Sequence, residues 1–158
     1  MTEETLKLLK TFSKSCRRSI IEMTKNSQSG HPGGSLSCVD YLALIYTQQI
    51  AKNGNKIVVS NGHISPGVYS VLGEMGYIDK EKAIETFRKR GSIYEGHITR
   101  HVDGVWYGTG PLGVGVSVAA AFAKAEKMRS TDEKVYGVMG DGEAQEGQVH
   151  EMIQFAQH

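Results

Sequence analysis

A single carboxylate, Asp141, lies between two glycines near the C-terminal end of the sequence. An apolar run from Val135 to Met139 precedes it, and a helix-like segment follows almost at once. This order places a carboxylate at the carboxyl end of a buried strand, where open α/β sheets bind their ligands. Gly140 and Gly142 let the backbone approach a bulky group closely. The arrangement predicts a site for a hard cation that holds a diphosphate, although a strand-ending turn uses the same residue types.

Histidines stand in glycine-containing loops between predicted helices and strands: His31, His63, and the pair His97 and His101, of which the residues favour one as a site residue and the other as a surface residue. An imidazole on a rigid loop can donate a hydrogen bond to a substrate oxygen or transfer a proton near neutral pH. A helix C-cap followed by proline also explains Gly30 and Pro32, but it gives His31 no role. For His63, a hydrogen-bonded turn residue is an equally good interpretation, and the residues alone leave both alternatives open.

Residues 108–113 match the dinucleotide-binding pattern G-x-G-x-x-G letter by letter. That pattern needs a strong strand before it, and the apolar segment 105–107 is too short for one. Pro111 is also foreign to the pattern. We therefore expect no nicotinamide dinucleotide here, but a glycine-rich loop that runs into a helix N-terminus is suited to holding another cofactor.

Periodicity, caps and β-branched runs predict the elements that position these loops. They indicate helices over 4–25, 37–49, 66–75, 79–90, 113–127 and 146–158, and strands over 56–60 and 134–139. The second helix is expected to begin with a capping box at Ser37, and the fifth to be largely buried. Phe12, Phe87 and Phe122 are expected in the core. Alternating helices and short apolar strands predict one α/β domain over 1–158, with a mostly parallel sheet that is incomplete at the C-terminus.

The composition is that of an ordinary globular protein of 158 residues. Eighteen basic and 17 acidic side chains give a net charge of +1, which offers no electrostatic argument for binding nucleic acid or an anionic membrane. Cys16 and Cys38 lack metal-ligand spacing, and buried reduced thiols are the favoured interpretation over a disulfide. With an acidic N-terminus and no long apolar run, we expect a cytoplasmic protein.

Five motifs in a fixed order resemble a known family. They are Ser-Gly-His-Pro-Gly at 29–33, Ser-Asn-Gly-His at 60–63, Gly-Ser-x3-Gly-His at 91–97, Thr-Gly-Pro-Leu-Gly-x-Gly at 109–115 and Gly-Asp-Gly-x3-Glu-Gly at 140–147. Over nearly its whole length the chain resembles the N-terminal, diphosphate-binding domain of transketolase. Deoxyxylulose-phosphate synthase shares some of these elements but does not usually carry the Gln-Glu-Gly of 145–147, so it fits less well.

The resemblance implies a thiamine-diphosphate-binding α/β fold with helices on both faces of the sheet. It also implies thiamine diphosphate as cofactor, with magnesium, or else calcium or manganese, bound by Asp141. The other implied site residues are Gly142 at the diphosphate, Gly110, Pro111 and Leu112 along the cofactor, His63 between diphosphate and substrate, His31 and His97 at substrate hydroxyls, Arg88 near the substrate channel, and Glu146 at a dimer interface.

Two departures from the family pattern, Val114 for glutamine and Ile98 for proline, look tolerable. The family's second metal ligand, an asparagine, and the glutamate that activates the aminopyrimidine ring would both lie beyond His158. We therefore expect the N-terminal part of a transketolase, which transfers a two-carbon ketol unit between sugar phosphates. It should be inactive alone and should work as a homodimer or with a C-terminal transketolase chain.

Two alternatives remain open on the sequence. One is a non-catalytic chain of the same fold that binds a homologous partner. The other is a different thiamine-diphosphate enzyme, similar to deoxyxylulose-phosphate synthase, that uses another acceptor. The sequence does not distinguish which ketose and aldose a transketolase of this kind would use.

Overall fold

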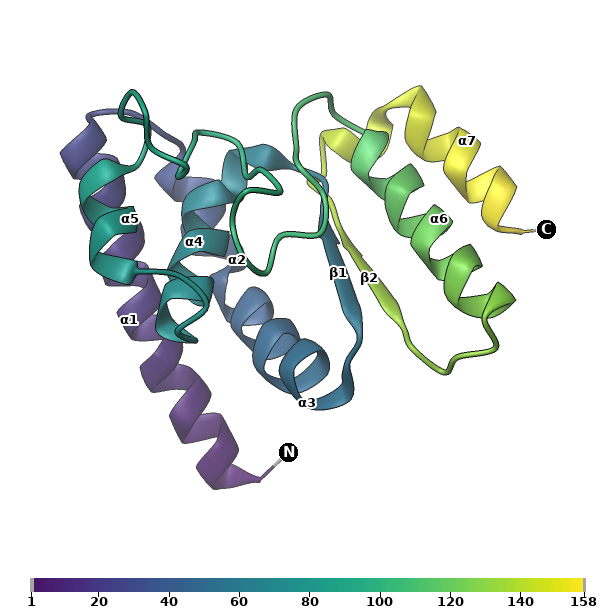
Figure 1. Cartoon of the computed structure of the whole chain (residues 1–158), viewed down its shortest axis with the longest axis horizontal. Coiled ribbons are helices and arrows are strands. Elements are labelled where there is room, and N and C mark those ends of the chain that lie inside the picture. The colour runs from purple at the N-terminus through teal and green to yellow at the C-terminus, as the bar shows by residue number, and fades with distance from the viewer. Residues whose placement is uncertain (1, 158) are drawn as a thin grey trace.

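The computed structural model describes residues 2–157 and arranges them in three layers (Figure 1). One outer layer contains four helices: α1 (Glu3–Ser27), α2 (Pro32–Leu44), α4 (Ser65–Glu74) and α5 (Lys80–Thr86). The other contains α6 (Val114–Met128) and α7 (Gly147–Ala156). Short segments connect these elements: π-helical η1 (Ile45–Ile50), α3 (Ala51–Asn53), and 3-10 helices η2 (Gly62–Ile64) and η3 (Glu143–Gln145).

The middle layer is a sheet in which β1 (Lys56–Val59) and β2 (Val135–Val138) run parallel. Their first residues are paired, as are their last, and the Ser60 amide extends the ladder by donating to the Val138 carbonyl at 2.7 Å. Both carboxyl ends therefore meet at one edge. The predicted α/β class is confirmed, and the described residues contribute two strands to the sheet.

The core lies between the four-helix layer and the sheet. In α1 the apolar spacing predicted from the sequence buries Cys16, Ile20 and Met23. Phe87 is fully buried and Phe12 packs against the same cluster, as expected. Phe122 was expected in the core too, but it is only partly buried and lies outside this cluster, because α6 is on the other side of the sheet.

Two predicted helix boundaries are wrong. The second helix begins at Pro32 and not at a capping box, because proline is pre-organised for a first helical turn and Ser37 Oγ donates to the Gly34 carbonyl inside the helix. The fourth helix has Asp79 as its N-cap, as predicted, but it ends at Thr86. The positive φ of 58° at Arg88 is incompatible with continuing it.

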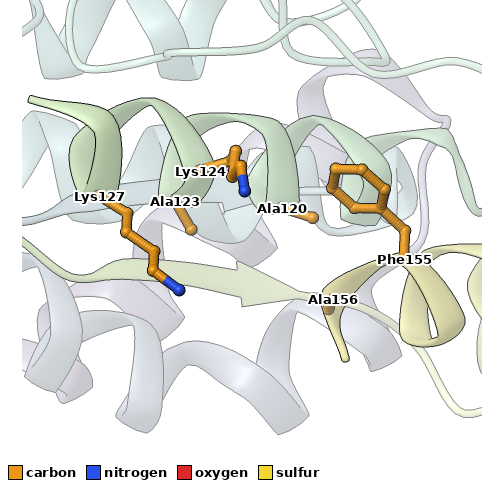
Figure 2. A pocket seen from close by; sticks show the side chains of 6 residues that line it. All are labelled: Ala120, Ala123, Lys124, Lys127, Phe155 and Ala156. Carbon is orange, nitrogen blue, oxygen red and sulfur yellow. The ribbon is translucent and has the colours of Figure 1, made fainter. Parts of the chain in front are cut away.

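The prediction that the fifth helix is largely buried is also wrong. Helix α6 buries Gly115, Val116 and Ala119 against the sheet, while much of its outer face is exposed because α7 is the main element of residues 2–157 that packs there. An apolar groove of about 310 Å³ follows this contact, and Figure 2 shows Phe155 of α7 facing α6 across it. The groove is lined by Ala120, Ala123, Lys124, Lys127, Phe155 and Ala156.

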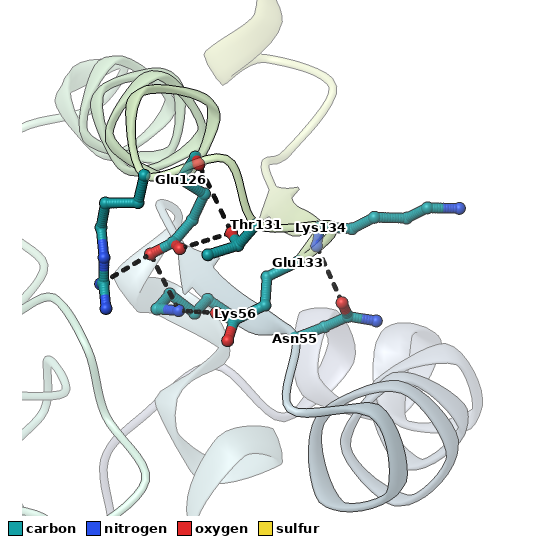
Figure 3. Close-up of polar contacts among 7 residues, drawn as sticks. Asn55, Lys56, Glu126, Thr131, Glu133 and Lys134 are labelled. Carbon is teal, nitrogen blue, oxygen red and sulfur yellow. Dashed lines mark hydrogen bonds and ion pairs between the residues drawn. The ribbon is translucent and has the colours of Figure 1, made fainter.

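At the amino ends of the strands, a polar network joins β1 to α6 (Figure 3). Lys56 Nζ lies 3.1 Å from Glu126 Oε1 and also pairs with Glu133, and it sits 5.6 Å from the centre of the Trp106 ring. Thr131 donates to Glu126 Oε2 at 2.8 Å. This network lies at the end of the sheet opposite to the 108–113 loop and the Gly-Asp-Gly segment. Among residues 2–157, none of the helices is both apolar and long enough to span a membrane.

Candidate functional site

The structure brings the three predicted histidines together at the carboxyl edge of the sheet. The ring centres of His31 and His63 are 4.9 Å apart, and those of His63 and His97 are 5.8 Å apart. His31 precedes α2, His63 lies in η2 just past β1, and His97 comes from the long 91–109 loop. Three segments that are far apart in sequence thus contribute one imidazole each to a common site.

The position of His97 follows from close packing against η2. Its Nδ1 lies 3.2 Å from Thr109 Oγ1, and a side chain at Gly62 would overlap both groups. The Thr109 amide donates to the Ile98 carbonyl at 3.0 Å, and the Ile98 amide donates to Ser65 Oγ at 2.9 Å. These contacts anchor the base of the loop beside His63 and fix the His97 ring.

The surroundings of His97 favour its neutral form. Burial lowers the pKa of His97 most, and electrostatic repulsion from His63, Arg88 and His31 lowers it further. A neutral imidazole has one nitrogen free to accept a proton. The cluster therefore contains an imidazole able to act as a base near neutral pH.

Arg88, the predicted channel residue, is held next to the histidines. Its Nη1 donates to Ser29 Oγ at 2.7 Å, and its guanidinium fills the space that a side chain at Gly96 would need. With Lys89, Arg90 and the acidic Glu95 it lines an open hollow of about 580 Å³, so three cations face one carboxylate there. The result is a basic surface beside the imidazole cluster, which suits an anionic group.

The Gly-Asp-Gly segment follows β2 at the same edge. Asp141 is exposed, and a Cβ added at Gly142 would meet no atom within 4 Å. A Cβ at Gly140 would lie 3.6 Å from Asn61 Nδ2, and Asn61 Oδ1 is buried without a hydrogen-bond partner. This edge thus presents a carboxylate and open backbone, with an unpaired amide oxygen buried beside them.

The predicted cofactor loop leads into α6 beside this segment. Gly110, Pro111 and Leu112 are exposed, and Gly113 has a φ of 80° that favours glycine. A Cβ at Gly113 would lie 3.2 Å from the Cβ of Glu146, the exposed residue that precedes α7. Leu112 and Glu146 therefore occupy neighbouring parts of the surface.

Sequence reasoning missed one buried carboxylate, Glu143. Its Oε1 accepts hydrogen bonds from Ser60 Oγ at 2.5 Å and from the Gly113 amide at 2.8 Å, while Oε2 accepts one from the Gly140 amide at 3.1 Å. The available signal was a second acidic residue directly after Gly-Asp-Gly. Its importance depends on contacts with residues 30 and 83 positions away, which a local motif does not reveal.

Residues 10–158 match the model of a family described as transketolase, thiamine diphosphate binding domain. The chain belongs to this family. It is 36% identical over 159 residues to a subunit of the apulose-4-phosphate transketolase of Phocaeicola vulgatus, covering 96% of this chain and 55% of that protein. It is 34% identical to a 6-deoxy-6-sulfo-D-fructose transketolase subunit of a Clostridium species, covering 80% and 49%. The transketolase domain described here thus spans about half the length of these relatives.

Solved transketolases have the same arrangement. The Leishmania mexicana enzyme superposes with a TM-score of 0.87 at 28% identity, covering 95% of this chain and 25% of that one. The Campylobacter jejuni enzyme gives 0.85 at 32% identity, covering 94% and 26%. The predicted resemblance to a transketolase N-terminal domain is confirmed.

The carboxyl edge of this transketolase domain fits thiamine diphosphate with a divalent cation. Asp141 offers one carboxylate, and open backbone at Gly110 and Gly142 leaves room for phosphate oxygens. Within residues 2–157, no three His, Cys, Asp or Glu side chains are grouped to hold a metal. Magnesium suits such a site because it typically takes one or two protein carboxylates and completes its shell with phosphate and water.

Proposed function

We propose that this chain is the N-terminal part of a split transketolase, which transfers a two-carbon ketol unit from a ketose to an aldose. The observation that supports this most directly is the convergence of His31, His63 and His97 at the sheet edge that also bears Asp141. Family membership alone would be compatible with a non-catalytic partner chain. Such a chain has no need for three clustered imidazoles.

Each part of the site has a task in this proposal. Asp141 binds the magnesium, or calcium or manganese, that holds the cofactor diphosphate, and Gly142 and Gly110 let backbone approach it. When bound, thiamine diphosphate supplies the nucleophilic carbon and the electron sink for the transfer. The histidines donate hydrogen bonds to sugar hydroxyls and move protons at the reacting carbonyl oxygen, with the neutral imidazole of His97 as an acceptor.

The substrates that we propose are anionic sugars, sugar phosphates above all. Arg88, Lys89 and Arg90 outnumber Glu95 in the hollow next to the imidazole cluster, and this net positive charge suits a terminal phosphate or sulfonate. The relatives named above act on a sugar phosphate and a sulfosugar by their names. This agreement supports an anionic terminus without choosing between the two.

The partner that we propose is a C-terminal transketolase chain. Two relatives that this chain matches along most of its length are named as subunits, which implies a second subunit in those enzymes. In a homodimer or a larger assembly, exposed Glu146 and Leu112 would lie at a subunit interface. The chain alone is then expected to bind cofactor weakly and to show no ketol transfer.

Calorimetric titration with thiamine diphosphate tests the proposal. Measurements use this chain alone and mixed with a C-terminal transketolase chain, with and without MgCl₂. We expect magnesium-dependent binding that weakens by about tenfold or more in Asp141→Asn, since a carboxylate ligand is lost. Asp132→Asn is the matched control, because Asp132 is an exposed aspartate before β2. Absence of binding by the mixture, or equal binding by Asp141→Asn, would contradict the cofactor role.

A further inference from the structure

Glu143 contacts all three segments that form the proposed cofactor edge. It lies in η3 and is 3% exposed. Ser60 follows β1, Gly140 follows β2, and Gly113 precedes α6. The three hydrogen bonds of Glu143 therefore join both strand ends to a helix N-terminus. We propose that Glu143 is a positioning residue that holds the Gly-Asp-Gly loop and the 108–113 loop in register before cofactor binds, an inference that rests on the function proposed above.

The chemistry of the contacts requires a carboxylate. All three partners can donate, and a carboxylate accepts at both oxygens, whereas a glutamine amide accepts at only one. Burying a carboxylate is costly unless hydrogen bonds satisfy it, and here two backbone amides and a hydroxyl do so. These bonds tie the position of each loop to that of the other, because they end on the same side chain.

The hydrogen bonds of Glu143 also bear on the position of Asp141, the proposed metal ligand. Gly140 is its neighbour, and the Gly140 amide donates to Glu143 Oε2 at 3.1 Å. The same side chain fixes Gly113, which ends the loop containing Gly110 and Leu112. The proposed metal ligand and the proposed cofactor loop are therefore positioned by one side chain that itself faces away from solvent.

A matched residue separates positioning from general stability. Glu126 is also 3% exposed and also hydrogen-bonded, but it lies in the network at the opposite end of the sheet (Figure 3). Replacing either glutamate by glutamine removes one buried carboxylate. Only the change at Glu143 should loosen the cofactor loops.

The experiment compares wild type, Glu143→Gln and Glu126→Gln. Backbone amide exchange at Gly113 and Gly140 is measured by NMR in the cofactor-free chain, and thiamine diphosphate affinity is measured with excess MgCl₂ and the C-terminal chain. In Glu143→Gln we expect exchange at Gly140 to rise about tenfold and affinity to fall about tenfold, the effect of losing one charge-assisted hydrogen bond. In Glu126→Gln both values stay at the wild-type level.

Unchanged exchange in Glu143→Gln, or an equal change in Glu126→Gln, would overturn the proposal, as would faster exchange with unchanged affinity. If wild type binds no cofactor, the proposed function fails, and amide exchange alone decides whether Glu143 holds the loops. Should Glu143→Gln not fold, Ser60→Ala removes a single donor to the same carboxylate. A smaller rise in exchange at Gly113 and Gly140 is then expected, and no rise would overturn the proposal.

Discussion

Gly62 and His97 pack so closely that a single carbon atom added to Gly62 would overlap the imidazole ring. The same atom would also overlap Thr109 Oγ1, the hydrogen-bonding partner of His97 Nδ1. The orientation of a proposed proton-transfer group therefore depends on the absence of a side chain one residue before another histidine, His63.

Gly62→Ala is expected to displace His97 and break its contact with Thr109. Gly62 does not have a left-handed φ, so alanine is compatible with its backbone, and the effect comes from packing alone. Overpacking of this kind costs about 1–3 kcal/mol in the free energy of unfolding. Urea denaturation measures the loss, and the NMR shifts of the His97 ring report the displacement.

Gly147→Ala is the control for this change. Its added carbon would meet no atom within 4 Å, and its φ is not left-handed either. We expect stability that is unchanged or raised by about 0.4–1 kcal/mol, because alanine restricts the unfolded chain, and unchanged His97 shifts. If Gly62→Ala has the same free energy of unfolding and the same His97 shifts as Gly147→Ala, the site tolerates a side chain at position 62.

The pKa of His97 is expected below its ordinary value of 6.5, and Arg88→Gln should raise it by removing a nearby positive charge. In the wild type, His97 binds a proton more readily in the unfolded chain than in the folded one. Its contribution to the free energy of unfolding is therefore complete above the pKa that His97 has in the unfolded chain. It is lost as pH falls through 6.5 toward the folded pKa. NMR titration of the His97 ring measures its pKa in the folded wild type and in folded Arg88→Gln. Arg90→Gln serves as control, and a wild-type pKa at or above the ordinary value would exclude the predicted surroundings.

The sequence predicted the positions of the three histidines better than the bounds of the elements that support them. Local motifs place His31, His63 and His97 in loops, and apolar runs predict where the strands end. Because parallel strands bring their carboxyl ends to one edge of a sheet, the histidines that follow them are expected to converge there. Asp141 was predicted on the same grounds. What these features share is that the decisive information lies within a few residues of each side chain.

Features that depend on distant contacts were missed. Glu143 looks like an ordinary helix-start residue until Ser60 and Gly113 are seen to bind it. The exposure of α6 depends on which elements cover its outer face, and apolar composition does not reveal that. The start of α2 at Pro32 was missed because two glycines suggested a loop, whereas packing against α1 and α4 stabilises them as helix.

Lys56→Met is expected to lower the midpoint of thermal unfolding. The side chain of Lys56 is 14% exposed, and its loss leaves the buried Glu126 carboxylate without its closest cation (Figure 3). Arg129 Nη1, 3.5 Å from Glu126 Oε1, and Thr131 remain as partners, so Glu126 is under-compensated and not unpaired. Removing one partner of a buried ion pair is destabilising, whereas apolar replacement of both partners is often neutral. The double variant Lys56→Met/Glu126→Leu should therefore unfold at a higher temperature than Lys56→Met.

Lys134→Met provides the comparison, because Lys134 joins the network through its backbone: its amide donates to Asn55 Oδ1 at 2.8 Å, and its carbonyl accepts from the Lys56 amide at 2.9 Å. We expect little change in its unfolding midpoint. A midpoint for Lys56→Met equal to that of Lys134→Met would mean that the ion pairs at this end of the sheet add nothing to stability.

The two cysteines are expected to be unreactive in the folded protein. Both are free and buried, and burial raises the pKa of Cys16 to about 12 and that of Cys38 to about 11. Since the thiolate is the reactive form, dithionitrobenzoate at pH 8 should label neither thiol in the native chain and both in urea. Ser37→Cys, an exposed position on the same helix as Cys38, should add one thiol that reacts at once. Rapid native labelling of wild type would show that α1 and α2 separate readily, and the layer that carries His31 would then be less rigid than the proposed mechanism needs.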